Sequence, residues 1–391
     1  MKASPPEIAG AVLITAVLTL TVGCSTYKPA SPGEASLEDA RGRTVHALDV
    51  RDPQRLDEVM DAIASHDVVL VGERHDVFAH HLNQLAVIRG LAGRWPDMAI
   101  GMEFFQRPYQ QALDDYVAGR IDESEMLSRT EYFDRWRFDY RLYRPILRFA
   151  RERGIPLVAL NLPAEITRKV GAEGIGALEP DEAAQLPREM DRSDPDYDAR
   201  LKAVYDQHPG TGSGEFERFV DVQLLWDEGM AETAADYLAQ HPGRRMVILA
   251  GSGHVAHRSG IPDRLERRLG VRPAVVVSEA PPAAELSQVD FVLLSRDEDL
   301  PPPGRMGIFM EGGEGAGVRV TRVLEDSGAE RAGLASGDLI TALDGRAVSS
   351  PSEIRIAMID RGPGDRILIT LQRDSDGSVQ TLDYEVRLGG G

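Results

Sequence analysis

Residues 68–81 read VVLVGERHDVFAHH: four apolar residues, a glycine, a glutamate and, within seven positions, three of the chain's nine histidines. A short apolar run that stops at Gly72 is typical of a buried strand ending in a turn. In open α/β sheets, ligands bind beyond the carboxyl ends of the strands. We therefore expect Glu73 and His75 to form one wall of a binding site, with other walls supplied by later strands.

The size and charge of the chain exclude some classes of protein. Its 391 residues are enough for two or three domains, and 42% of them are hydrophobic, which allows a sizeable core. With 44 basic and 63 acidic residues, the net charge is −19. Nucleic-acid binding needs a basic surface, so this balance argues against a nucleic-acid partner.

The first residues have the pattern of an export segment. Ile8–Val22 is almost wholly apolar but short for a membrane span, and Cys24, the only cysteine, follows it. Residues 1–23 resemble a bacterial lipoprotein signal peptide, and this resemblance implies that Cys24 is acylated and inserted in a lipid bilayer. Residues 24–44 would then be a tether, and the protein would lie at the periplasmic face of the outer membrane. An uncleaved anchor or a plain signal peptide is the alternative.

Strand-like and helix-like segments alternate through the first three quarters of the chain. Continuous apolar runs alternating with amphipathic stretches are typical of a mainly parallel sheet covered by helices on both faces, an α/β fold. The runs expected to be strands are Val68–Val71, Met98–Met102, Leu157–Leu160, Met246–Ala250 and Ala274–Val277. The stretches expected to be helices are His81–Ala92, Pro145–Arg153, Phe216–Gln240 and Pro262–Leu269.

Two segments interrupt this alternation. Glu179–Gly214 is rich in Asp, Pro and Gly, and we expect a helical or loop insertion there. Leu300–Gly304 reads LPPPG, which neither a helix nor a central strand can continue. The first large domain is therefore expected to span 45–299, and a smaller, β-rich domain to span 305–390.

Polar residues follow the proposed strands at comparable positions. Because the carboxyl ends of parallel strands meet at one sheet edge, we expect these side chains to converge on one site. We expect the neighbouring glycines to permit tight turns and to keep the cleft open. The residues expected to converge are Glu73, His75, Glu103, Asn161 and His254.

Several of these motifs together resemble the ChaN family of haem-binding lipoproteins. That family belongs to a superfamily with the Tiki proteases, the TraB proteins and the erythromycin esterases. Six motifs in the matching order carry the resemblance: GERH at 72–75 with HHLNQ at 80–84, GME at 101–103, YRPI at 143–146, ALN at 159–161, VQLLWDEGMA at 222–231 and GSGH at 251–254.

The resemblance implies a haem-binding, iron-uptake protein. Haem iron accepts His, Tyr or Met as axial ligand. The available candidates are His75, His208, His254, Tyr132, Tyr140, Tyr143 and Tyr205, of which we assign His75 and His254 to iron. The aromatic and arginine residues of 134–143 could stack on a porphyrin and pair with its propionates, unless they form an ordinary amphipathic surface. The residues expected to bind haem are Glu73, His75, Glu103, Tyr143, Asn161, Gln223, Asp227 and His254.

A metal-dependent hydrolase of the Tiki type is the alternative function. Glu73, His75, Glu103 and His254 form a set of N and O ligands that could hold a divalent metal and activate water. The chain has no G-x-S-x-G or H-E-x-x-H motif. We favour binding over catalysis, and a scaffold that acts through its second domain is a third hypothesis.

The segment after the prolines resembles a bacterial PDZ domain. Its motifs are GRMGIF at 304–309, GVRVTRV at 317–323, SGAERAGL at 327–334, GDLI at 337–340 and GPG at 362–364. PDZ domains bind a C-terminal peptide as an added strand. The resemblance assigns the peptide carboxylate to the loop Met306, Gly307 and Ile308, unless the domain serves only packing or dimerisation. A homodimer is left open.

Overall fold

The structure is a computed structural model that describes residues 53–207, 214–281, 283–312, 317–375 and 377–390. The signal segment, Cys24 and the tether predicted from the sequence lie outside the described residues. Within the described ranges, none of the helices combines the length and apolar character needed to cross a membrane.

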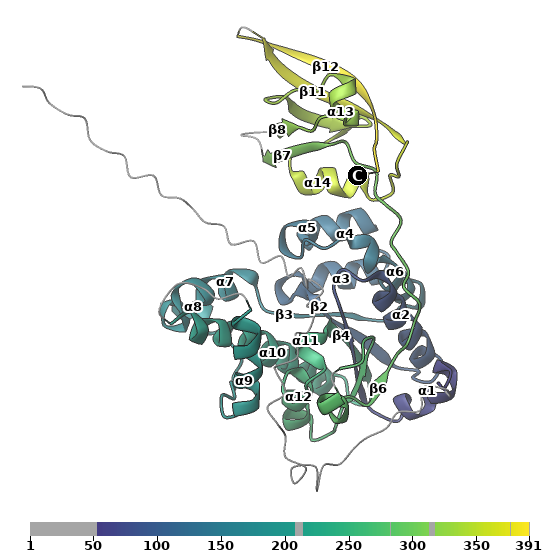
Figure 1. Cartoon of the computed structure of the whole chain (residues 1–391), viewed down its shortest axis with the longest axis vertical. Helices are drawn as coiled ribbons and strands as arrows, with labels where there is room; N and C mark the ends of the chain where they lie inside the picture. The colour runs from purple at the N-terminus through teal and green to yellow at the C-terminus, as the bar shows by residue number, and fades with distance from the viewer. Residues whose placement is uncertain (1–52, 208–213, 282, 313–316, 376, 391) are drawn as a thin grey trace, which may run out of the picture. The chain divides into compact units, whose positions relative to one another are not determined.

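A six-stranded sheet forms the centre of the first domain (Figure 1). Every strand pair is parallel, in the order β3-β2-β4-β1-β5-β6. This arrangement confirms the predicted α/β fold, with all five expected strands in place. The strands are β1 (Val68–Glu73), β2 (Met98–Gln106), β3 (Leu157–Asn161), β4 (Arg245–Gly251), β5 (Ala274–Val277) and β6 (Phe291–Val292).

The sequence of β1 explains its central position. All six of its residues are buried, as expected for a parallel strand covered on both faces. Its neighbours are β4, where Leu70 pairs with Ile248, and β5, where Leu70 pairs with Val275. Successive side chains alternate between faces, so Val69 and Val71 belong to one hydrophobic cluster while Leu70 belongs to the other.

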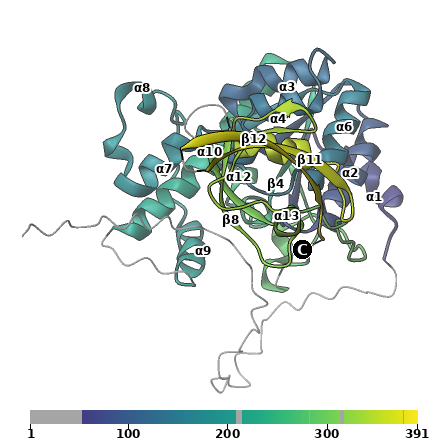
Figure 2. The ribbon, with the colours of Figure 1, turned by 90° about the horizontal axis from the view of Figure 1, so that it is seen from above.

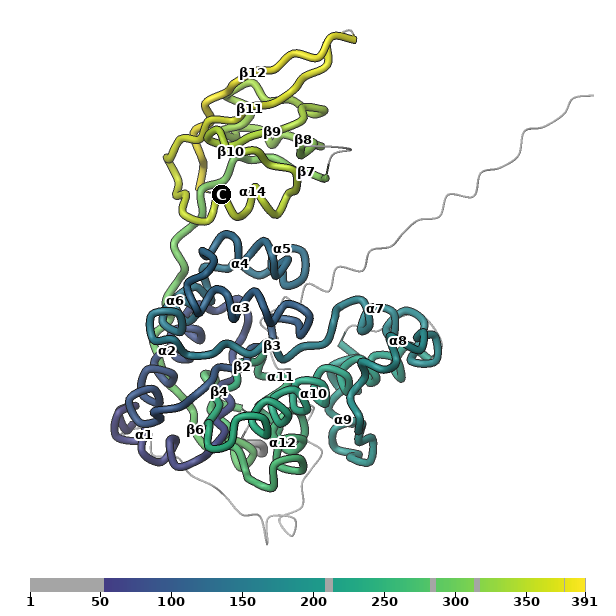
Figure 3. Tube along the Cα trace, turned by 180° about the vertical axis from the view of Figure 1, so that it is seen from behind, coloured from purple at the N-terminus to yellow at the C-terminus, as the bar shows by residue number. Residues whose placement is uncertain are grey.

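Helices cover both faces of the sheet, as Figures 2 and 3 show from two further directions. The cluster on the Val69 face is built with side chains of α1 to α6, and the cluster on the Leu70 face with side chains of α10, α11 and α12. The bounds are α1 (Leu56–Ala64), α2 (Phe78–Ala92), α3 (Gln110–Val117), α4 (Glu123–Arg129), α5 (Tyr132–Arg135), α6 (Arg144–Arg153), α7 (Ala164–Glu173), α10 (Glu215–Gln240), α11 (Ser252–Val255) and α12 (Ile261–Leu269).

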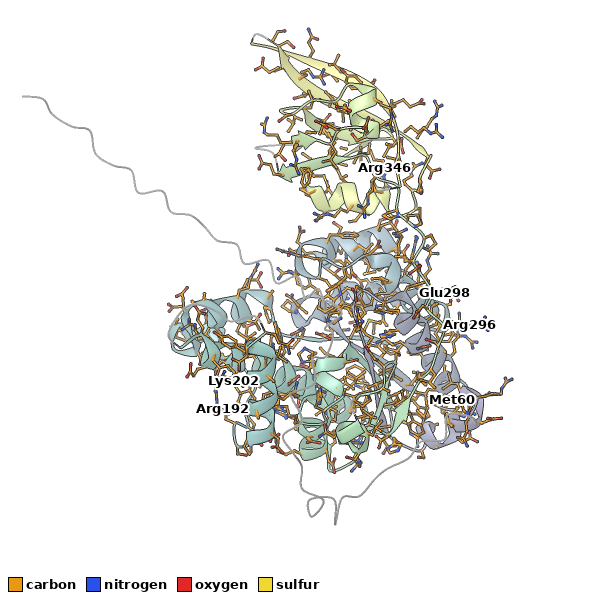
Figure 4. The ribbon with its side chains drawn as sticks, in the orientation of Figure 1. Met60, Arg192, Lys202, Arg296, Glu298 and Arg346 are labelled. Atoms are coloured by element: carbon orange, nitrogen blue, oxygen red, sulfur yellow. The ribbon has the colours of Figure 1, made fainter. Side chains whose placement is uncertain are left out.

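The described residues of the predicted insertion form two helices, α8 (Pro180–Ala183) and α9 (Pro195–Tyr205). Asp194 caps α9 by accepting hydrogen bonds from two backbone amides of its first turn. Tyr197 and Leu201 pack against α10, in a cluster of their own. The insertion is therefore fixed to α10 by an apolar contact, and Figure 4 labels Arg192 and Lys202 on it.

In its described residues, the second domain is an antiparallel sheet with two short helices. Its strand order is β12-β11-β9-β8-β7, with β10 paired to β9, so β7 lies at an edge of the sheet. Its core is a separate hydrophobic cluster that includes Met306, Ile340 and Ile369. The elements are β7 (Ile308–Gly312), β8 (Val318–Val323), α13 (Gly328–Ala332), β9 (Leu339–Leu343), β10 (Arg346–Ala347), α14 (Pro351–Met358), β11 (Arg366–Ser375) and β12 (Ser378–Arg387).

Gly328 provides a test of this second fold. A Cβ atom at Gly328 would lie 1.9 Å from the carbonyl oxygen of Arg387, at the end of β12. Because backbone cannot yield as a flexible side chain can, Gly328→Ala should destabilise the domain by about 2 kcal/mol or more. That loss should lower its thermal midpoint by at least about 8 °C. Gly312→Ala is the control, since a Cβ there meets nothing within 4 Å. Equal midpoints for the two variants would contradict the packing.

Candidate functional site

Three adjacent strands bring the predicted site residues to one edge of the sheet. β4 lies between β2 and β1, and Gly251 at the end of β4 is in register with Glu73 at the end of β1. Glu103 lies in the buried last part of β2. α11 follows β4 directly and carries His254. The site therefore lies at the carboxyl ends of central strands, where α/β sheets bind ligands.

His75 is held by the carboxylate of Glu73. The imidazole donates from Nδ1 to Glu73 Oε1 over 2.6 Å, and the side chain of His75 is 22% exposed while that of Glu73 is 2% exposed. Trp136 meets the imidazole edge-on, with ring centres 4.8 Å apart, and Phe138 lies 4.9 Å away. These contacts fix the ring, and its Nε2 atom has no hydrogen-bond partner among the described residues.

His254 is held in the same way by Asp227 of α10. Its Nδ1 donates to Asp227 Oδ1 over 2.6 Å, and its Nε2 lies 3.5 Å from Glu103 Oε1. Asp227 is buried, and its second oxygen accepts a 2.8 Å hydrogen bond from the hydroxyl of Tyr197. Tyr197, from the insertion, therefore orients the carboxylate that orients His254.

Glu103 joins the ends of β2, β3 and β4. Its Oε2 accepts a 2.6 Å hydrogen bond from the backbone amide of Gly251. Its backbone carbonyl accepts from the side-chain amide of Asn161, at the end of β3, over 3.1 Å. Asn161 therefore supports the position of Glu103 through the backbone.

The strand-end glycines act by allowing close approach, and the expectation that they form tight turns was wrong. Gly72, Gly101 and Gly251 lie within β1, β2 and β4 rather than in turns, and none of them has a positive φ. A Cβ on Gly251 would lie 2.9 Å from His75 Cε1, and one on Gly72 would lie 3.1 Å from the hydroxyl of Ser252. The absence of a side chain at Gly251 lets the imidazole of His75 pack against β4.

Tyr143 lies inside the aromatic cluster beside the site. It is fully buried, and its hydroxyl accepts a 3.0 Å hydrogen bond from Nε1 of Trp136. Its ring packs on Phe104 and His81, at 4.2 and 4.4 Å between ring centres. Burial raises the pKa of Tyr143 well above its usual range. The structure thus places Tyr143 as a support for Trp136, and its expected part in haem binding stays a prediction.

The remaining predicted residues lie along α10. Gln223 is partly exposed, about one turn before Asp227, and no described hydrogen bond joins it to either histidine. Met230, in the same VQLLWDEGMA motif, is buried in the Leu70-face cluster. Of these three residues of α10, only Asp227 contacts a histidine of the site, His254.

Sequence reasoning missed three supporting residues. His81 is buried, with Nε2 3.2 Å from the backbone carbonyl of His75 and Nδ1 3.1 Å from the amide oxygen of Gln84. Gln84 in turn donates to the carbonyl of Val71 in β1. The HHLNQ motif at 80–84 could have pointed to His81 and Gln84. The role of Tyr197 depends on a contact between distant segments that no local pattern reveals.

The charges around the histidines raise the pKa of both. For His75, burial lowers the pKa, but the hydrogen bond and charge of Glu73, with the charge of Glu103, outweigh it and raise the value to about 9. For His254, burial also lowers the pKa, but the charges of Asp227 and Glu103 and the hydrogen bond to Asp227 outweigh it, so the pKa is raised. Without a ligand, His75 is therefore a cation at neutral pH.

Each carboxylate of the site has at least one partner, although Glu73 Oε2 is buried without a hydrogen bond to any described residue. Glu73 and Asp227 accept from the two imidazoles, and Glu103 accepts from a backbone amide. Throughout the ranges that the structure describes, no group of three or more His, Cys, Asp or Glu side chains is arranged to hold a metal ion. The expected divalent-metal alternative thus has no preformed ligand group among these residues.

Two family models match the chain. The first, described as haem-binding uptake, Tiki superfamily, ChaN, matches residues 59–265, just over half of the chain. The second is a PDZ domain model, which matches residues 304–386. Both matches agree with the resemblances found in the sequence.

Among curated proteins, the chain is similar to protein RETICULATA-RELATED 5, chloroplastic, of Arabidopsis thaliana, with 24% identity over 242 residues. This match covers 56% of this chain and 32% of that protein. The chain is 47% identical over 58 residues to a probable periplasmic serine protease do/HhoA-like of Haemophilus influenzae, covering 15% of this chain and 12% of the protease. The matches thus span about a third of the length of the Arabidopsis protein and about an eighth of the length of the Haemophilus protease.

A solved structure that describes cofacial haem binding to ChaN of Campylobacter jejuni is also similar. The identity is 17%, the match covers 57% of this chain and 85% of that chain, and the TM-score is 0.46.

The ion pair of His75 and Glu73 predicts a pH dependence of stability. In the folded protein the pKa of His75 is about 9, above the ordinary value of 6.5. The ion pair therefore stabilises the folded state fully below pH 6.5, and this stabilisation is lost as the pH rises through 9. The loss should be on the order of 2–3 kcal/mol. Denaturant unfolding from pH 6 to 9.5 should show this fall in the wild type and a flatter curve in Glu73→Gln. Asp61→Asn, at an exposed position, is the control. Parallel curves for wild type and Glu73→Gln would contradict the assignment.

Proposed function

The chain belongs to the ChaN family of haem-binding uptake proteins in the Tiki superfamily, and we propose that it binds haem at the sheet edge that carries His75 and His254. The second domain is a PDZ domain, for which we propose the docking of a protein partner. Together these activities suit a protein of haem or iron uptake.

The pair of anchored imidazoles is the observation that supports haem binding most. Imidazole nitrogen is an axial ligand of haem iron, and a carboxylate on the opposite ring nitrogen orients the ring and raises its basicity as a ligand. His75 and His254 each have this carboxylate, through Glu73 and Asp227. The Nε2 atom of His75 has no hydrogen-bond partner among the described residues. The two imidazoles therefore fit haem iron as ligands, and the iron would arrive with the haem that the protein binds and carries.

The surface beside His75 suits a porphyrin. Trp136 and Phe138 are partly exposed next to the imidazole and offer ring faces and edges for stacking. Of the arginines expected to pair with propionates, Arg135 already pairs with Glu131 and Glu165, and Arg141 with Asp139. Arg137 is exposed and has no ion pair in the described structure, so it is the arginine of this segment best suited to a propionate.

The PDZ domain has the backbone geometry of a peptide-binding edge. β7 is an edge strand, and the loop before it turns at Gly307, which has a φ of 83°. The carbonyl of Met306 accepts from the amide of Ala329 in α13, and that of Gly307 from the amide of Leu324 just after β8, at 2.9 Å each, which fixes the loop in place. A partner's C-terminus added along β7 would reach this loop with its carboxylate.

The sequence at the N-terminus supports a location for these activities. An acyl chain on Cys24 and a tether of residues 24–44 would keep both domains near the periplasmic face of the outer membrane. We propose that the PDZ domain docks there on a membrane or periplasmic partner while the large domain receives haem. Homodimer formation stays a prediction from the sequence.

Hemin titration tests the proposed haem site. The protein from Ser25 onward should shift the Soret band of hemin to a saturable end point. His75→Ala and His254→Ala should each weaken binding at least tenfold, because each removes one imidazole donor. His66→Ala is the matched control, since His66 precedes β1 at the opposite end of that strand. A wild-type response no larger than that of an unrelated acidic protein would contradict haem binding, and equal weakening by His66→Ala would contradict the site.

The peptide-binding proposal can be tested without knowing the partner. A random peptide array with free C-termini should yield binders, and the same sequences with amidated C-termini should lose most of that binding, because the loop amides recognise a carboxylate. The protein truncated after residue 303 is the control. Equal binding of free and amidated peptides would contradict the assigned loop.

A further inference from the structure

Phe309 and Arg322 form an exposed pair beside the open edge of the PDZ sheet. Phe309 lies in β7, the edge strand, and Arg322 lies directly opposite it in β8 (Figure 1). Phe309 is 47% exposed and is the only aromatic residue among the exposed large hydrophobic residues in the described ranges. The guanidinium of Arg322 lies over its ring, 3.9 Å from the ring centre. The pair therefore carries a positive charge from β8 toward the unpaired side of β7.

The pair stands on the face of β7 that turns away from the domain core. Ile308 and Met310 pack against the PDZ core cluster. Phe309 and Glu311, which alternate with them along the strand, are exposed. Because side chains of a strand point to opposite faces in turn, Phe309, Glu311 and the exposed Arg322 share one outer face beside the edge.

A peptide added along β7 would bring alternate side chains to this outer face. The inference rests on the proposed peptide binding, in which the terminal carboxylate lies at the loop 306–308 and the peptide runs antiparallel to β7. The last residue of the peptide then lies beside Ile308, and the penultimate residue lies beside Phe309. Residues directly opposite each other in an antiparallel pair have their side chains on the same face. The penultimate side chain therefore meets Phe309 and the guanidinium above its ring.

The guanidinium of Arg322 is available to a carboxylate. Its side chain forms no ion pair or hydrogen bond with the described residues. A guanidinium stacked on an aromatic face keeps its N–H groups in its own plane, where they can donate to both oxygens of a carboxylate. The stacking also restricts the side chain beforehand, and so reduces the entropy that an exposed ion pair otherwise loses.

We propose that the Phe309–Arg322 pair selects partners whose penultimate residue is acidic, aspartate or glutamate, at a free C-terminus. The carboxylate would pair with the guanidinium while the methylene groups beneath it pack on the Phe309 ring. Glu311 makes this selection depend on position. It lies two residues further along the same face, beside the peptide side chain two places before the penultimate one, where an acid would meet a like charge. The domain would therefore recognise one acidic residue at a defined place rather than an acidic tail in general.

Fluorescence anisotropy with a single host peptide tests this selection. The host is a binder from the free-C-terminus array, synthesised with Glu, Gln, Lys or Trp at the penultimate position, and once more with the Glu moved two places earlier. Wild-type protein from Ser25 onward should bind the penultimate Glu peptide about three- to fivefold more tightly than the Gln peptide, the range of an exposed ion pair. The preference should fall below about twofold in about 1 M salt. The peptide with the displaced Glu should bind no more tightly than the Gln peptide.

Variants of Arg322 test the residue that makes the selection. Arg322→Gln should remove the preference for Glu, and Arg322→Glu should reverse it in favour of Lys. Because Arg322 is exposed, neither change should disturb the fold. Arg346→Gln is the matched control and should keep the wild-type preference. Arg346, which Figure 4 labels, is also exposed and has no ion pair in the described structure, but it lies in β10, which pairs with β9 rather than with β7.

Three outcomes would overturn the inference and leave peptide binding intact. They are an unchanged preference for Glu in Arg322→Gln, an equal loss of that preference in Arg346→Gln, and a wild-type preference for Trp over both Glu and Gln. Equal binding of the host peptide with a free and with an amidated C-terminus would overturn the proposed carboxylate loop and this inference together.

Discussion

The hydrogen bonds between two imidazoles and two buried carboxylates determine how the site of this protein is built. Glu73 and Asp227 are almost fully buried, and an ionised carboxylate in such surroundings is strongly disfavoured unless a charged partner satisfies it. His75 and His254 are those partners, each through Nδ1. Because Nδ1 is committed in both rings, the direction of each ring is set by the protein itself, with Nε2 of His75 unpaired among the described residues and Nε2 of His254 beside Glu103.

The parallel sheet makes this arrangement possible. β1 and β4 are adjacent, so the residues that follow them lie close together although about 180 positions separate them in the chain, and β2 adds Glu103 on the other side of β4. The glycine at 251 allows the ring of His75 to pack directly against β4. Asp227 comes from α10, and the insertion adds Tyr197 behind it. The site thus draws its two histidines from the sheet edge and their support from helices on both faces.

Much of this arrangement follows from the sequence, because strand position is encoded locally. Continuous apolar runs predicted the five main strands, and the shared edge of parallel strands predicted that Glu73, Glu103 and His254 would meet. The burial of Tyr143 could not be predicted, because it depends on how the segment from Trp136 to Phe138 folds back on Phe104. The contact of Tyr197 with Asp227 could not be predicted either, since it joins an insertion without a motif to α10. The glycines were correctly singled out but for the wrong reason, because close approach and tight turning leave the same mark in a sequence.

The central claim is that histidine nitrogen at this sheet edge binds the iron of the ligand. The most direct measurement is pulsed electron paramagnetic resonance of the hemin-loaded protein, prepared once with ¹⁴N-histidine and once with ¹⁵N-histidine. The account predicts nitrogen couplings on the ferric centre that change with the histidine label and decrease when His75 or His254 is replaced. A spectrum that is insensitive to the histidine label, with the features of a phenolate or water ligand, would contradict it.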